Sequence, residues 1–317
     1  MSFSSNAKNE ISRMDTSEDC CALAELSALV RMNGTIQIMG SNKYILKFRT
    51  ENAAIARRIF SILKILYNTN VEIVVRKNRQ LKKNNNYLIL VNNKKISNKI
   101  LHDVGFIDEN EIDFLFPSYK VPDKIIANRC CKRSYIRGSF LGGGSISNPE
   151  KTYHLEFVTN NKEHAKDLSD IINSFGLNSK IVLRKENYVV YIKEGEQIVD
   201  VLNIIGAHQA LLKFEDVRVL KDVRNNINRI VNCETANLSK TIDASMRQVE
   251  QIKYIDEKIG LNKLPISLKE IAELRLENPD ASLKEIGSML SQPIGKSGVN
   301  HRFKKIEKIA NELRGEK

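Results

Sequence analysis

The amino-acid sequence repeats itself after about 110 residues. Four matched pairs carry the repeat at nearly constant offset: Tyr44–Thr50 with Tyr153–Thr159, Ile73–Lys77 with Ile181–Lys185, Cys20–Cys21 with Cys130–Cys131, and Gly34 with Gly144. Solenoid repeats are much shorter, roughly 20–50 residues. The sequence therefore predicts a pseudo-symmetric pair of α+β subdomains.

Both repeats show the same predicted order of elements. An apolar helix (23–32 or 135–141) ends at glycine and precedes a strand that alternates apolar and polar side chains. An amphipathic helix (52–67 or 161–175) and a hairpin of two strands follow (71–79 with 87–91, or 180–184 with 188–193). An antiparallel sheet can bury one face and leave the other for a partner.

Basic residues exceed acidic ones. The chain has 50 Lys and Arg against 38 Asp and Glu, a formal net charge of +12. Such an excess favours a polyanionic partner, because neutralised phosphates release condensed counterions. Residues 71–100 concentrate this charge, and we expect hairpin residues to contact phosphates: Arg76, Lys77, Lys82 and Lys83 in the first repeat, and Arg184 and Lys185 in the second.

The sequence offers no sign of a membrane or an exported protein. Its best apolar run, 59–67, contains Lys64 and falls short of the roughly 18 residues that a membrane span needs. No apolar leader segment opens it, and five cysteines fit a reducing compartment better than a disulfide framework. We expect a cytoplasmic protein.

The C-terminal segment predicts a helix-turn-helix. Ser282 and Glu285 form a capping box before a helix at 283–290, and Pro293 and Gly295 break the chain before a second helix at 297–313. A preceding helix at 267–276 would complete a three-helix core. The expected base-reading residues are Ser297, Asn300, His301 and Arg302, and the expected further DNA contacts are Ser282, Lys284, Lys296, Lys304 and Lys305. The alternative is an amphipathic helix pair with a solvated charged face.

The segments at 25–36 and 135–146 resemble the signature helices of the LAGLIDADG homing endonucleases. In that family each helix ends in an acidic residue before its final glycine, and the two carboxylates hold the divalent metal for cleavage. The matching positions here are Asn33 and Gly143. Neither supplies the charged oxygen ligand that Mg²⁺ requires. The resemblance therefore implies the fold without the activity, and no catalytic residue is expected.

The chain is also similar to the WhiA family, in the stretches 130–149, 228–244 and 282–306. The resemblance implies a non-enzymatic transcriptional regulator on double-stranded DNA in the nucleoid. The family is tied to sporulation in filamentous actinomycetes, and to cell division and chromosome segregation in Firmicutes-type bacteria. The Lys-, Asn- and Ile-rich composition is typical of a low-GC organism and favours the second role. Transcription or division proteins are further candidate partners.

The resemblances imply two LAGLIDADG-like repeats of αββαββ type, the first at 1–125 with an N-terminal extension and the second at 126–222. A linker at 223–245 and an all-α helix-turn-helix domain at 246–317 are expected to follow. Residues 228–244 could also form a phosphate contact or a partner surface. Two other functions stay open: an active LAGLIDADG-type endonuclease or maturase, and a division-machinery adaptor.

The paired cysteines could suggest a metal. Adjacent cysteines do not comfortably ligate one ion together, and the C-x₂-C spacing of zinc sites is absent. We therefore expect no metal and no cofactor, and we interpret Cys20–Cys21 and Cys130–Cys131 as small buried residues beside the helix interface.

Overall fold

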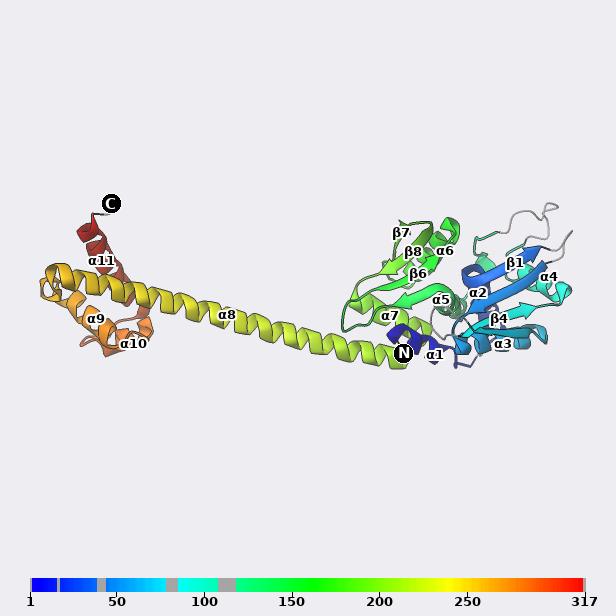
Figure 1. Cartoon of the computed structure of the whole chain (residues 1–317), viewed down its shortest axis with the longest axis horizontal. Helices are drawn as coiled ribbons and strands as arrows, with labels where there is room; N and C mark the ends of the chain where they lie inside the picture. Colours follow the sequence, from blue (N-terminus) through cyan, green and yellow to red (C-terminus); the bar gives the residue numbers. More distant parts are fainter. Residues whose placement is uncertain (1, 16–17, 39–43, 78–84, 108–117, 316–317) are drawn as a thin grey trace. The chain divides into compact units, whose positions relative to one another are not determined.

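The computed structural model describes residues 2–15, 18–38, 44–77, 85–107 and 118–315 (Figure 1). The chain divides into two compact units, 1–221 and 222–317. The described strands all lie in the first unit, and the described secondary-structure elements of the second unit are all helices. No described helix is both long and apolar enough to cross a lipid bilayer.

The first unit contains the predicted repeat (Figure 1). Helix α1 (Phe3–Ile11) precedes both copies. The first copy is α2 (Asp19–Asn33), β1 (Gly34–Ile38), β2 (Tyr44–Thr50), α3 (Ala53–Tyr67), β3 (Glu72–Lys77), β4 (Asn85–Val91) and α4 (Lys94–Asp103). After the short 3₁₀ helix η1 (Asp123–Ile125), the second copy is α5 (Arg129–Gly143), β5 (Gly144–Ile146), β6 (Leu155–Thr159), α6 (Lys162–Asn173), β7 (Lys180–Arg184), β8 (Asn187–Ile192) and α7 (Gly195–Ile205). The α+β class and the pseudo-symmetry are confirmed.

Each copy forms a four-stranded antiparallel sheet, in the orders β1-β2-β4-β3 and β5-β6-β8-β7. Strand β2 alternates as its sequence predicts: Tyr44, Leu46 and Phe48 are buried, while Arg49 is exposed. Side chains alternate across a pleated strand, so one face of each sheet packs on helices and the other carries the polar residues.

Helices α2 and α5 pack against each other at the centre of the first unit (Figure 1). Both begin earlier than the sequence predicts, so each includes its cysteine pair. A Cβ at Gly138 would overlap the Glu25 carbonyl oxygen and lie 2.9 Å from the Ala28 Cβ. A Cβ at Gly142 would lie 2.6 Å from the Met32 Cβ. Because contacts advance together along both helices, the two run parallel, with like positions of the repeat facing each other.

Buried charged side chains of α2 form hydrogen bonds that hold neighbouring segments against this helix pair. Glu25 accepts two hydrogen bonds from Arg58 of α3, at 2.7 and 2.8 Å. Arg31 donates to the carbonyls of Val104 at 3.0 Å, Gly105 at 2.9 Å and Lys120 at 2.8 Å. A buried charge is costly unless it is fully partnered, so these contacts hold the segments after α4 against α2.

The second unit is a small helical bundle. Helix α8 (His208–Ile259) ends in it, followed by η2 (Leu261–Lys263), α9 (Ile266–Glu277), α10 (Leu283–Met289) and α11 (Lys296–Arg314). Its core includes Ile255, Ile271, Ile286 and Phe303. The predicted capping box of Ser282 and Glu285 is present.

The expected linker is helical. Residues 223–245 lie inside helix α8 and do not form an irregular connection. The segment is rich in Asn, Thr and Ser, but it contains no glycine or proline. Those two residues are the ones that most strongly disfavour a helix interior, so nothing in the segment breaks the helix that enters it from both sides.

His164 generates a prediction about pH. The imidazole is fully buried, with Nε2 2.9 Å from the Tyr135 hydroxyl and Nδ1 3.2 Å from the Thr159 hydroxyl. Burial, and then the charge of Arg31, lower its pKa to about 3. An unfolded chain protonates its histidines near pH 6.5, but the folded imidazole stays neutral until about pH 3. The unfolded state therefore binds more protons, and stability falls as pH drops below about 6.5, by up to about 1.4 kcal/mol per pH unit.

We expect His164→Gln to lose less thermal stability than the wild type between about pH 6.5 and 5.5, as measured by calorimetry of the first unit's transition. His301→Gln, at an exposed position of the second unit, is the control and should behave as the wild type. Equal pH dependence in His164→Gln and the wild type would contradict this role.

Candidate nucleic-acid interface

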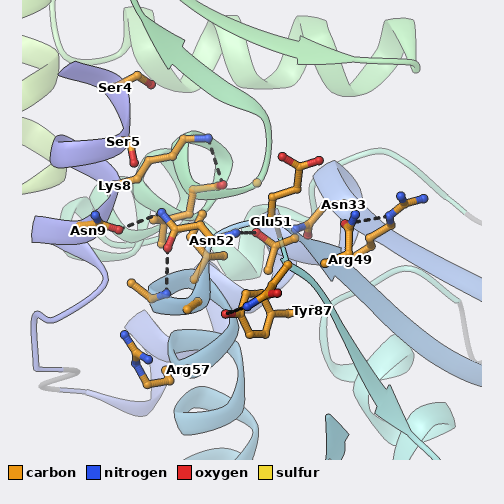
Figure 2. A pocket seen from close by; sticks show the side chains of 18 of the residues that line it. Ser4, Ser5, Lys8, Asn9, Asn33, Arg49, Glu51, Asn52, Arg57 and Tyr87 are labelled. Carbon is orange, nitrogen blue, oxygen red and sulfur yellow. Dashed lines mark hydrogen bonds between the residues drawn. The ribbon is translucent and has the colours of Figure 1, made fainter. Parts of the chain in front are cut away.

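A groove lies beside the C-terminal ends of α2 and α5, with a volume of about 1310 Å³ (Figure 2). Helix α1, the start of α3 and strands β2 and β4 supply most of its lining. Asn33 and Gly142 place the ends of the two signature helices in its wall. The groove therefore occupies the position where the endonuclease resemblance places the catalytic centre.

The charge of this groove is positive. Its described lining includes four cationic residues and the acid Glu51; the cations are Lys8, Arg13, Arg49 and Arg57. The Lys8 ammonium donates to the Leu141 carbonyl at 3.3 Å (Figure 2). It also lies 5.6 Å from the centre of the Phe140 ring. Burial lowers the pKa of Lys8 to about 8. Sequence reasoning missed these cations because they are scattered along the chain without a motif; the position of Arg49 on an alternating strand was the one available signal.

The two degenerate positions do not fit a divalent metal. The Asn33 side-chain oxygen is buried and has no hydrogen-bond partner among the described residues. Position 143 has no room for a side chain, because a Cβ there would overlap the Met32 methyl group and lie 2.7 Å from the Val158 carbonyl oxygen. One neutral oxygen among several cations cannot replace a pair of carboxylates around Mg²⁺.

The polar face of the first sheet carries cations beside amides. Lys47 donates to the Gln37 side chain at 2.5 Å, and Arg49 donates to the Asn86 side chain at 3.2 Å. Arg76 is exposed on β3, on the same face as Asn86. Among the residues that the structure describes, these three cations form no ion pair that a phosphate would first have to break. Of the other predicted contacts in this hairpin, Lys77 is the last residue of β3, and Lys82 and Lys83 lie outside the described residues.

The second sheet differs because Glu156, at the position that matches Lys47, pairs with Arg184. The first sheet has Glu72 on its polar face, where it accepts from the Asn92 side chain at 2.6 Å. The Glu156 carboxylate is 3.0 Å from the His154 ring nitrogen and 3.8 Å from the Arg184 guanidinium, and it accepts from the Ser145 hydroxyl at 3.2 Å. Lys185 occupies the hairpin turn, with a left-handed φ of 56°. The structure thus gives Arg184 a carboxylate partner, whereas no ion pair is found for Arg76 within the described chain.

Helix α11 exposes most of the predicted DNA contacts on one side. Val299, Phe303 and Ile306 face the core of the second unit. The helix begins at Lys296, so this lysine belongs to the helix and not to the preceding turn. The predicted contacts that α11 leaves exposed are Lys296, Ser297, Asn300, His301, Lys304 and Lys305.

The three remaining predicted DNA contacts are Ser282, Lys284 and Arg302, and two of them form hydrogen bonds within the second unit. The Ser282 hydroxyl accepts from the Glu285 backbone N–H at 3.3 Å, as the helix cap. Lys284 is exposed on α10. Arg302 is half-buried and donates to the Ser267 carbonyl of α9 at 3.4 Å, so it lies apart from the exposed side of α11.

The turn between α10 and α11 is held by a close backbone contact. Residues 290–295 separate the two helices, and the Ile294 N–H donates to the Gly287 carbonyl at 3.1 Å. A Cβ at Gly287 would overlap the Ile294 carbonyl oxygen. Glycine at this position therefore allows the turn to fold back onto α10, which fixes where α11 starts.

Comparison with known proteins covers nearly the whole chain. Three family models match: the WhiA N-terminal LAGLIDADG-like domain at 19–107, the WhiA LAGLIDADG-like domain at 132–224 and the WhiA C-terminal HTH domain at 227–310. A protein of Alkaliphilus metalliredigens named "Probable cell division protein WhiA" is 57% identical over 99% of both chains. One of the same name from Clostridium botulinum is 55% identical over 99% of both. A crystal structure of full-length DUF199/WhiA from Thermatoga maritima is 25% identical, with a TM-score of 0.59, and the match covers 98% of this chain and 99% of that one.

The crowding at position 143 leads to a prediction. We expect Asn33→Asp with Gly143→Asp to lower stability, by about 1–3 kcal/mol for overpacking alone, and to leave DNA uncut in Mg²⁺ or Mn²⁺. Calorimetry and plasmid nicking measure the two effects, and Asn33→Asp alone is the control for added charge without the clash. Metal-dependent cleavage by the unmodified protein would overturn the non-catalytic interpretation.

Proposed function

This chain belongs to the WhiA family, and from that premise we propose that it is a DNA-binding regulator that does not cleave DNA. The observation that carries the proposal is the exposed polar side of α11 in a helix-turn-helix unit. Its relatives are named as probable cell division proteins. We propose that this chain regulates transcription in cell division and chromosome segregation, in the cytoplasm and on the nucleoid.

Helix α11 is proposed to read base edges. Asn300 and His301 are exposed near its N-terminal end, where recognition helices contact bases. Lys296, Lys304 and Lys305 flank them and suit phosphates. The N-cap residue of α11 is Gly295, which makes no side-chain hydrogen bond to the first turn. The backbone N–H groups of that turn are therefore available to a phosphate.

The body is proposed to add affinity that does not depend on sequence. The cations of the groove and the first sheet attract phosphate, and the same cations disfavour a divalent metal. Lys77, Lys82, Lys83 and Lys185 stay predicted phosphate contacts. The expected domain limits at 125, 222 and 245 likewise stay proposals.

Substitution of Asn300 tests sequence reading. Asn300→Ala should weaken binding to a cognate site by about 1–3 kcal/mol and change binding to unrelated DNA little, because amide contacts to base edges carry sequence information. Fluorescence anisotropy with both DNAs measures this. Lys308→Ala, farther along α11 and paired with Glu312 at 3.8 Å, is the control. Equal losses on both DNAs would contradict base reading.

Chromatin immunoprecipitation separates a regulator from a division-machinery adaptor. A regulator gives discrete peaks that the Asn300→Ala protein loses. Diffuse signal from the wild type would favour the adaptor.

The contrast between the two sheets gives a second binding prediction. Arg76→Gln should reduce the slope of log K against log salt by about 0.9, the value for one lost phosphate contact. Arg184→Gln should change it less, because Glu156 already partners Arg184. Binding titrations across a salt series measure both slopes. An unchanged slope in Arg76→Gln would place this face away from DNA.

A further inference from the structure

Four cysteines meet where α2 and α5 begin. The Sγ atoms of Cys20, Cys21, Cys130 and Cys131 all lie within 4.8 Å of one another. Cys21 and Cys131 are buried, as the sequence predicts for interface residues, but Cys20 and Cys130 are exposed. Each repeat supplies one adjacent pair, so the cluster brings together equivalent residues of the two repeats.

The distances fit a shared ion better than a disulfide. A tetrahedral zinc with Zn–S bonds of about 2.3 Å separates its sulfurs by about 3.8 Å. The Cys130 and Cys131 sulfurs are 4.0 Å apart, and no pair in the cluster exceeds 4.8 Å. A disulfide needs about 2.05 Å. Closing onto an ion therefore requires much smaller movements than forming a sulfur–sulfur bond.

The surroundings favour thiolates. All four cysteines occupy the first turns of parallel helices, whose N-terminal ends carry partial positive charge. A cation bound there would take the place of the thiol protons.

We propose that these four thiolates bind one zinc ion, which joins the starts of α2 and α5. Four sulfur ligands in a tetrahedral set are typical of a structural zinc site. The exposed Cys20 and Cys130 leave a path for the ion, and the buried Cys21 and Cys131 anchor it to the core. The argument against zinc from the sequence holds for one adjacent pair of cysteines taken alone. The packing of α2 on α5 brings two such pairs together, so that four sulfurs are available to one ion.

Zinc here would act on the helix pair at the end opposite to the groove. Binding displaces the thiol protons to solvent, and the four Zn–S bonds hold the two repeats together without any change of oxidation state. Four thiolates with one Zn²⁺ carry two net negative charges, which the two helix N-termini offset in part. The site therefore contributes stability and takes no part in DNA cleavage.

Cobalt substitution of the reduced full-length chain, after bound metal has been removed with a chelator, tests the proposal. Under anaerobic conditions we expect a thiolate-to-cobalt charge-transfer band that saturates at one Co²⁺ per chain and disappears when Zn²⁺ is added. Elemental analysis should find one zinc per chain after isolation. A strong chelator should lower the melting temperature of the first unit.

The variant Cys20→Ser with Cys130→Ser changes the exposed pair and leaves the buried pair in place. It should lose the cobalt band and the effect of chelator while keeping its far-ultraviolet circular dichroism. Cys233→Ser changes the exposed cysteine of α8 and is the matched control, which should retain both.

Three results would overturn the proposal. They are the absence of a cobalt band in the reduced wild type, an equal band in the double variant, and mass spectrometry showing that the protein isolated from cells carries a disulfide between the repeats in place of metal. The cobalt spectrum of the wild type tests the proposal even if the double variant fails to fold.

Discussion

The close contact between α2 and α5 is the constraint on which the first unit depends. Gly138 allows it, because any side chain there would overlap the Glu25 carbonyl. Glu25 also accepts from Arg58, so the contact and the buried ion pair position α3 together. Each sheet follows directly from one of these helices, since β1 begins at Gly34 and β5 at Gly144. The arrangement of both sheets thus derives from one helix interface.

The same interface supports the proposal that the chain combines a LAGLIDADG-like fold with the absence of DNA cleavage. At the C-terminal ends of the helices, Met32 fills the space that a side chain at position 143 would need. Lys8 and Arg49 bring positive charge to the adjoining groove. A site with several cations and no pair of carboxylates attracts phosphate and does not suit a divalent metal.

The repeats share their fold and differ in their surfaces. Arg76 and Arg184 occupy matching positions in the two sheets. Among the residues that the structure describes, Arg184 has a carboxylate partner, Glu156, and Arg76 has none. Internal packing constrains both copies alike, because the buried positions must match the helix interface. The exposed faces carry no such constraint, so the charge of one sheet can differ from that of the other without any change in fold.

The sequence by itself determined the features that depend on neighbours along the chain. Periodicity located two helices and three strands of each repeat, but not β1, β5, α1, α4 or α7. Ser282 with Glu285 located the start of α10, because a capping box closes within one turn. Only the tertiary structure decided which distant residues meet. Lys8 reaches Leu141, Arg302 reaches Ser267, and two cysteine pairs from different repeats converge on one point. No pattern among neighbouring residues predicts these contacts, because they depend on how α2 packs on α5 and how the turn at 290–295 folds onto α10.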